Sequence, residues 1–146
     1  ALGGSALAET ARPTVTALRD VTGESAQLWL PDGEWRVCLL SVEATHELRT
    51  IVDEGSRVAI DVGSGGRALQ GEAGTAGWVA TVGERADGVG SVSAGVLGPS
   101  GSVVAAVGIS GPIDRLGDDP GARFGGDVVA AANELSEALG VPPRHG

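Results

Sequence analysis

The chain offers few side chains that could perform covalent chemistry. Its 146 residues include one cysteine, Cys38, and two histidines, His46 and His145. A serine or cysteine nucleophile needs an activating base beside it, and the sequence places neither histidine next to Cys38 or Ser110. We therefore expect no catalytic residue, and we interpret Cys38, within RVCLLSV, as a small buried hydrophobe. A small hydrolase stays an alternative, and it requires His46 within about 2.6–3.2 Å of Ser110 or Cys38.

Neither a metal nor a cofactor is expected. No group of cysteines and histidines has zinc-ligand spacing. The stretch Gly63-Ser64-Gly65-Gly66 is rich in glycine, but it lacks the Gly-Lys-Ser/Thr ending of a P-loop and the spacing of a dinucleotide fingerprint. If Ser64 begins a short helix, the free N–H groups, the helix dipole and the hydroxyl form a small anion site, with Arg67 one turn further on. The alternative is a glycine-rich turn with a capping serine.

Three more serines could form a second polar patch. Ser91, Ser93 and Ser110 lie in apolar stretches, and neighbouring strands could bring them onto one face of a sheet. Gly108, two residues before Ser110, should face the same side and leave space there. The alternative is that these serines are simply solvated.

The spacing of apolar residues predicts the elements that would position these side chains. We expect an amphipathic helix from Ala6 to Arg19, disturbed in its middle by Pro13, and a final helix from Asp118-Asp119-Pro120 to a stop at Gly140 and Pro142. Between them we expect a short helix from Ser64 and strands over 25–30, 34–42, 57–62, 78–82, 89–97 and 102–110. This order predicts an α+β domain with an antiparallel sheet and helices packed on one face.

Charge and composition limit the partners of this domain. The chain has 10 basic and 19 acidic residues, a formal net charge of −9, which argues against contact with a phosphate backbone. It has no run of about 18 apolar residues that could span a membrane, and its opening is not typical of a signal peptide. We therefore expect a soluble protein, and the single cysteine fits a reduced, cytoplasmic setting.

Several segments together resemble the effector-binding domain of the IclR family of bacterial transcriptional regulators. The most specific are Thr22-Gly23-Glu24 and Ile109-Ser110-Gly111-Pro112 with Arg115 three residues on. The others, in chain order, are Ala11-Arg12-Pro13, Val42-Glu43 with Leu48-Arg49, Gly66-Arg67-Ala68-Leu69, Gly88-Val89, and Leu135-Ser136 with Leu139-Gly140. Their order and spacing carry the resemblance.

The resemblance implies a GAF/profilin-like sensory domain over residues 1–146. In that family a winged helix-turn-helix domain precedes this one and closes on a Leu-Gly pair, which Leu2-Gly3 resembles. The DNA-binding domain would therefore be absent from this chain, and DNA would be bound only through it. The family also implies a homodimer or homotetramer and a small effector, often a carboxylate or aromatic acid. The implied effector-binding residues are Gly63, Ser64, Leu69, Thr81, Ser91, Ser93, Gly108 and Ser110.

The sequence also departs from the family pattern. Asp61-Val62-Gly63-Ser64 stands where the family has an aromatic residue or histidine and Ala-Thr-Ala, and Asp61 would disfavour a nearby carboxylate. Thr81 stands where the family usually has an acidic residue. Only Gln70 to Ala76 replaces the helices and loops that usually follow the Gly-Lys-Ala-Leu element, so the cavity is expected to have less cover. A ligand-free dimerisation module is therefore an alternative, and it predicts exposed apolar patches.

Overall fold

The computed structural model describes residues 4–139 and centres on a six-stranded sheet. The strand order is β3-β2-β1-β6-β5-β4, and each neighbouring pair is antiparallel. The strands are β1 (Ser25–Asp32), β2 (Trp35–Val42), β3 (Arg57–Ala59), β4 (Val79–Val82), β5 (Val89–Leu97) and β6 (Val103–Pro112). The helices are α1 (Gly4–Thr22), α2 (Gly63–Leu69), the 3-10 turn η1 (Gly74–Ala76), α3 (Ile113–Leu116) and α4 (Pro120–Ala138).

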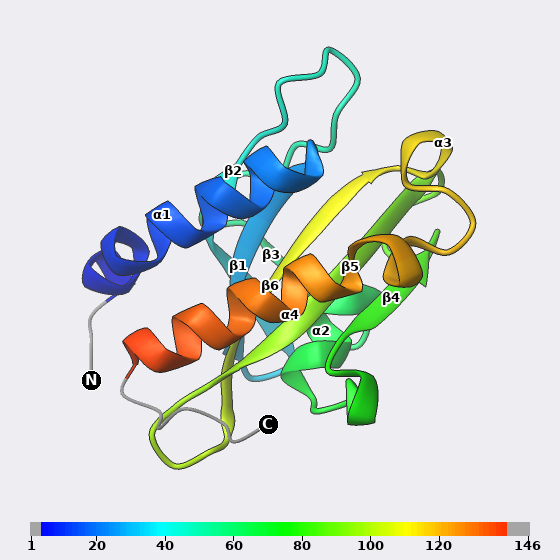
Figure 1. Cartoon of the computed structure of the whole chain (residues 1–146). Coiled ribbons are helices and arrows are strands. Elements are labelled where there is room, and N and C mark those ends of the chain that lie inside the picture. The colour runs from blue at the N-terminus through cyan, green and yellow to red at the C-terminus, as the bar shows by residue number, and fades with distance from the viewer. Residues whose placement is uncertain (1–3, 140–146) are drawn as a thin grey trace.

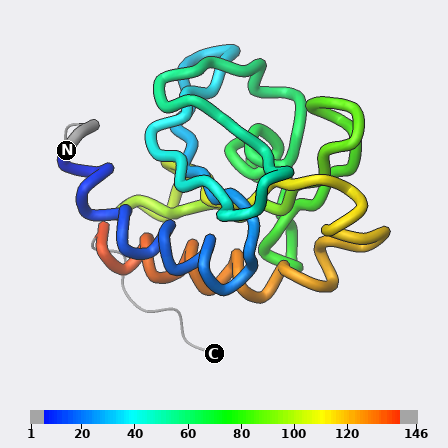
Figure 2. Tube along the Cα trace, turned by 90° about the horizontal axis from the view of Figure 1, so that it is seen from above, coloured from blue at the N-terminus to red at the C-terminus, as the bar shows by residue number. Residues whose placement is uncertain are grey.

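The two faces of the sheet carry different helices. The long helices α1 and α4 lie side by side over one face, and α2 lies behind the sheet in Figure 1 and across it from them in Figure 2. Leu28 and Val107 belong to the core under α1 and α4. Trp29 and Ala106, one residue away on the same strands, pack with Ala68 of α2. Because side chains alternate along a strand, the sheet separates a large core from a smaller one.

The expected α+β class and antiparallel sheet are confirmed, as are both hairpins. The first turns at Gly33, whose φ of +64° is a left-handed conformation that glycine adopts without a steric penalty. The long final helix begins at Pro120, and its N-cap Asp119 accepts a hydrogen bond from the Ala122 amide at 3.1 Å. The stop expected at Gly140 and Pro142 lies outside the described residues.

Three sequence expectations need correction. The helices do not all pack on one face of the sheet, because α2 covers the face opposite α1 and α4. Pro13 does not interrupt α1, which runs unbroken from Gly4 to Thr22. Pro13 is exposed, whereas Ala11 and Val15 are fully buried, so packing of the inner face outweighs one lost backbone hydrogen bond. Strand β6 also continues past Ser110 to Pro112 and leads into α3.

The two most specific sequence motifs meet in one ion pair. The Arg115 guanidinium donates from Nε to Glu24 Oε2 and from Nη2 to Glu24 Oε1, both at 2.7 Å. The Glu24 side chain is only 3% exposed, and Arg115 Nη1 also donates to the Leu48 carbonyl at 2.7 Å. A Cβ at Gly111 would collide with Glu24 and Leu116, so glycine is required there. These contacts connect the turn before β1, α3 and the loop before β3.

Candidate functional site

A small polar cavity lies between the sheet and α2. Its volume is about 10 Å³, enough for roughly one water molecule. It is lined by Gln27, Trp29, Arg36, Val52, Ser64, Gly65, Arg85, Ser91, Ser93, Ile109 and Ser110. We call it the serine cavity. Ser64, Ser91, Ser93 and Ser110, four of the eight residues expected to bind an effector, line it.

The strand register explains why the serines meet. Ser91 of β5 pairs with Ser110 of β6, and Ser93 pairs with Gly108. These positions lie on the face that α2 covers, and Ser64 of α2 reaches down to them. Its hydroxyl bonds to Ser91 Oγ at 2.7 Å and lies 2.8 Å from Ser93 Oγ. The serines are therefore a connected hydroxyl network rather than a solvated edge.

Ser110 lines the same cavity, but its hydroxyl bonds to Gln27 and not to the hydroxyl network of Ser64, Ser91 and Ser93. Its hydroxyl donates to Gln27 Oε1 at 3.1 Å, and Ser110 is only 4% exposed. Gln27 lies on β1, where it faces Gly108 across the strand pair. The inward direction expected of Ser110 is therefore what the structure shows.

The remaining expected residues surround the cavity without lining it. Thr81 on β4 pairs with Ser91, and their hydroxyls lie 3.0 Å apart. Gly63 lies beside the Arg36 and Arg85 side chains. Leu69 packs against the smaller core instead. Gly108 does not leave the space that the sequence suggested, because Ser93 occupies it and a Cβ there would collide with Ser93 and the Val92 carbonyl.

The start of α2 differs from the expected capped anion site. The helix begins at Gly63, its N-cap is Val62, and no side chain caps it. The first amide, Gly63 N–H, donates to Glu84 Oε1 at 3.0 Å, so a carboxylate of the chain itself already occupies this helix end. Ser64 lies inside the helix. A Cβ at Gly66 would overlap the Ile60 carbonyl, which explains why this segment needs glycine.

Two charged residues lie elsewhere than expected. The Arg67 side chain points away from the serine cavity and pairs with Glu84 at 2.7 Å and Glu72 at 3.0 Å. Glu84 is in the loop over residues 83–88 that joins β4 to β5, so this pair fastens the loop to α2. The hydrogen bond from Arg67 lowers the pKa of Glu84 below its usual range. Asp61 is exposed and does not line the serine cavity.

Sequence reasoning missed three polar residues that line the cavity, namely Gln27, Arg36 and Arg85. Arg36 is 2% exposed and stacks on the Trp29 ring with its guanidinium carbon 4.6 Å from the ring centre. Its Nη1 donates to the carbonyls of Val62 and, at 3.1 Å, of Ala59. Burial, and then the nearby Arg85, lower the pKa of Arg36 to about 10. For Gln27 and Arg36 a sequence signal was available, because each is a polar residue within an otherwise apolar strand. Arg85 lies in a loop and has no such signal.

The geometry that a hydrolase would need is not found in the described residues. Cys38 is 1% exposed, and burial raises the pKa of its thiol to about 12. Its sulfur lies 3.5 Å from the Leu40 carbonyl. His46 is exposed and forms no hydrogen bond with Cys38 or Ser110. His145 lies outside the described residues.

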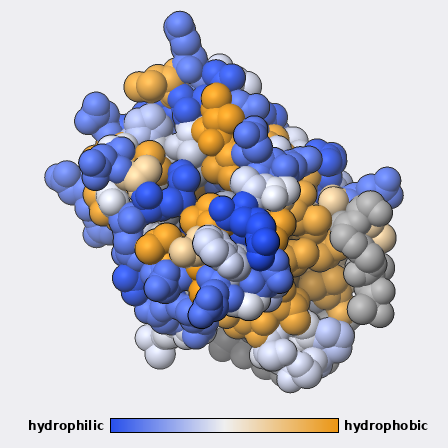
Figure 3. Space-filling view, turned by 180° about the vertical axis from the view of Figure 1, so that it is seen from behind, coloured by the Kyte–Doolittle hydropathy of each residue, from blue (hydrophilic) through white to orange (hydrophobic). Residues whose placement is uncertain are grey.

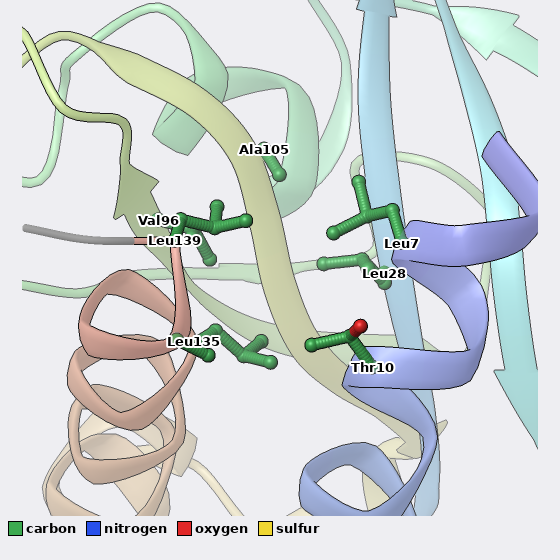
Figure 4. Close-up of a pocket in the computed structure, with 8 residues that line it drawn as sticks. Leu7, Thr10, Leu28, Val96, Ala105, Leu135 and Leu139 are labelled. Carbon is green, nitrogen blue, oxygen red and sulfur yellow. The ribbon is translucent and has the colours of Figure 1, made fainter. Parts of the chain in front are cut away.

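A second cavity, also of about 10 Å³, is lined almost entirely by apolar side chains. Figure 4 shows it between α1 and α4, with Leu7 and Thr10 on one side and Leu135 and Leu139 on the other. The Thr10 hydroxyl is the one polar side-chain group among the residues that line it. Over residues 4–139 there is also no cluster of three side chains suited to holding a metal ion, nor any helix long and apolar enough to cross a bilayer.

Comparison with known proteins finds similarity to bacterial transcriptional regulators. Residues 71–137 match the family described as "Bacterial transcriptional regulator IclR C-terminal". The HTH-type transcriptional regulator BhcR of Paracoccus denitrificans is 28% identical over 176 aligned positions, covering 96% of this chain and 62% of the relative. Because the alignment is longer than the chain, the relative contains stretches with no counterpart here. The chain thus spans less than two thirds of that regulator.

Solved structures of regulators share the fold. The Thermotoga maritima IclR structure matches with a TM-score of 0.83 at 18% identity, covering 92% of this chain and 68% of that one. Pseudomonas aeruginosa HmgR matches with a TM-score of 0.85 at 17% identity, covering 94% and 68%. A putative IclR-family regulator from Rhodococcus matches with a TM-score of 0.79 at 24% identity, covering 92% and 64%. The chain is thus similar to the C-terminal domain of the IclR family of bacterial transcriptional regulators, with the family match over residues 71–137.

Proposed function

We propose that this domain senses a small acidic metabolite in the serine cavity. In the whole protein it would thereby control operator binding by an N-terminal winged helix-turn-helix domain. The observation that carries the proposal is the meeting of Ser64, Ser91 and Ser93 hydroxyls in a buried cavity that two arginines also line. Hydroxyl and guanidinium donors suit a carboxylate. A regulator of this kind would work in the cytoplasm, as a homodimer or homotetramer.

The cavity must enlarge to admit a metabolite, because about 10 Å³ holds only about one water. The loop over residues 83–88 is the element suited to move. It begins and ends at glycines with φ of +72° and +76°, and Arg67 and Glu84 fasten it to α2 near the surface. Its Arg85 lines the cavity. The short segment over 70–76 adds only the turn η1 beside it, so little else would need to be displaced.

The energy required is modest. Coupling between an effector site and a distant site is typically about 1–3 kcal/mol. An effector that binds with millimolar to micromolar affinity gains about 4–8 kcal/mol. If the effector binds one subunit arrangement more tightly than the other, this difference in affinity is enough to shift the spacing of the DNA-binding domains.

Calorimetric titration with a panel of small carboxylic acids tests this proposal. We expect at least one acid to bind and to raise the melting temperature. Ser64→Ala and Ser110→Ala should each weaken binding about two- to tenfold, since a hydrogen bond contributes about 0.5–1.5 kcal/mol. Ser100→Ala is the control, because Ser100 is exposed and bonds only to Ser102 within the described residues. Neither heat nor thermal shift with any acid would contradict the proposal.

A ligand-free dimerisation module is the second candidate, and exposed apolar side chains favour it. Val21, Leu48 and Ile51 are 66%, 70% and 59% exposed. Figure 3 shows that apolar surface gathers on one side of the rear face while the rest is largely polar. In this case light scattering would show a dimer. The panel of acids would give neither heat in calorimetry nor a shift in melting temperature.

A further inference from the structure

The charges around the serine cavity are unbalanced. The chain has a net charge of −9, yet the charged residues that line this cavity are two arginines, Arg36 and Arg85. Within residues 4–139, neither forms an ion pair with a carboxylate. Glu84, the closest candidate, is engaged by Arg67 and the Gly63 amide instead. Buried charges are normally paired, so the cavity lacks a negative partner.

The same cavity contains donors without an acceptor. Arg36 Nε is buried and has no hydrogen-bond partner, and the same holds for Gln27 Nε2. Both side chains are at least nine-tenths buried and line the cavity. The Gln27 amide carries two N–H groups and has one side-chain partner, Ser110, so at least one N–H stays free whichever way the amide is turned. An unmade hydrogen bond on a buried donor is costly.

We propose that Arg36 and Gln27 hold the anionic group of the ligand, Arg36 from β2 with its guanidinium beside the start of α2 and Gln27 from β1, with Arg85 completing the site from the loop. This assignment rests on the proposed function and names the residues that select a carboxylate. The Arg36 guanidinium stays charged at neutral pH, since its pKa is about 10. A carboxylate would accept from Arg36 Nε and Gln27 Nε2, and so supply the missing charge and both missing acceptors.

The position of Arg36 also connects the ligand to α2. Its Nη1 donates to the carbonyls of Ala59 and Val62, which flank the connection from β3 to α2. Its Nη2 lies against Gly63, the first residue of that helix. An anion that fixes Arg36 would therefore fix the start of α2 as well.

The test replaces Gln27 by glutamate, which has nearly the same shape. Gln27→Glu places a carboxylate beside Arg36 and removes the free amide donor, while Ser110 can still donate to the side chain. Gln70→Glu is the matched control, because Gln70 is the only other glutamine in the chain and is exposed. The probes are sodium acetate, sodium propionate and neutral acetamide at constant ionic strength. Trp29 lies beside Arg36, so tryptophan fluorescence and calorimetry report binding.

We expect acetate or propionate to bind the parent chain more tightly than acetamide. Gln27→Glu should weaken carboxylate binding at least about tenfold, because a charge-assisted hydrogen bond is replaced by repulsion. It should also raise the melting temperature without ligand, since the new carboxylate pairs with Arg36. Gln70→Glu should change neither. If Gln27→Glu does not fold, Arg85→Gln provides the second variant and should weaken carboxylate binding severalfold.

The outcomes separate this assignment from the proposed function. Equal carboxylate affinity in the parent and Gln27→Glu, or equal affinity of the parent for acetate and acetamide, would overturn the assignment but leave a ligand-sensing domain. The same conclusion follows if Arg85→Gln, used because Gln27→Glu is unfolded, binds carboxylates as the parent does. If neither these probes nor any acid of the larger panel binds the parent chain, both proposals fail.

Discussion

Cys38 is the one thiol of the chain, and its surroundings make it unreactive. It is 1% exposed, beside Trp29 and Ala106 in the smaller core, and burial raises the pKa of its thiol to about 12. The thiolate is the reactive form. We therefore expect no reaction of the native protein with Ellman's reagent at pH 8 and one equivalent after denaturation in guanidinium. Rapid labelling of Cys38 in the native protein would contradict its burial in the smaller core.

Individual residues show where sequence reasoning succeeds and fails. The inward direction of Ser110 could be predicted, because alternation along a hairpin fixes which side a residue faces. The positions of the two arginines that line the cavity, Arg36 and Arg85, could not be predicted, because the direction of a long side chain depends on tertiary partners. Arg67 is drawn outward by Glu72 and Glu84, whereas Arg36 is held inward by two carbonyls.

The ion pair between Glu24 and Arg115 links the turn before β1 to α3, and it should be among the strongest single side-chain contacts in the fold. Arg115→Ala leaves the Glu24 carboxylate buried without a partner, which costs about 3 kcal/mol of unfolding free energy. Glu24→Gln keeps the shape and removes the charge, so it should cost less. Denaturant unfolding followed by circular dichroism measures both.

An exposed pair provides the control for this prediction. Arg57 and Asp32 lie 3.0 Å apart with side chains 55% and 56% exposed, and Arg57→Ala should cost at most about 1 kcal/mol. If Arg115→Ala lowered the unfolding free energy no more than Arg57→Ala does, the prediction for the buried ion pair would be wrong.

The order and type of most elements could be predicted, since period-two and helical spacing are local properties of the sequence. Tertiary packing determined the exceptions. α1 passes through Pro13 because its buried residues hold the helix on both sides, and α2 starts without a capping side chain because Glu84, from a loop 21 residues away, supplies the acceptor. The sheet order followed from pairing between β1 and β6, which no local pattern specifies.

The stability of the whole domain depends on the hydrophobic core under α1 and α4. Leu135 is 3% exposed and borders the apolar cavity between these helices. Leu135→Ala would enlarge this cavity and should lower the unfolding free energy by about 2–5 kcal/mol. Leu48→Ala, at a position 70% exposed, should change it by less than about 0.5 kcal/mol. Denaturant unfolding measures both changes. Equal effects of the two substitutions would contradict the stabilising role assigned to Leu135 in this core.

The contact between Glu84 and α2 has a consequence for timing. The Glu84 carboxylate holds both the Gly63 amide and Arg67. If the loop over residues 83–88 opens to admit the ligand, as proposed, entry and exit would require this contact to break. The association rate would then level off at high ligand concentration, at the rate at which the loop opens. The lifetime of the bound state would likewise be set by the protein more than by the ligand, so a regulator built on this domain would respond with a delay and keep its state briefly after the metabolite disappears.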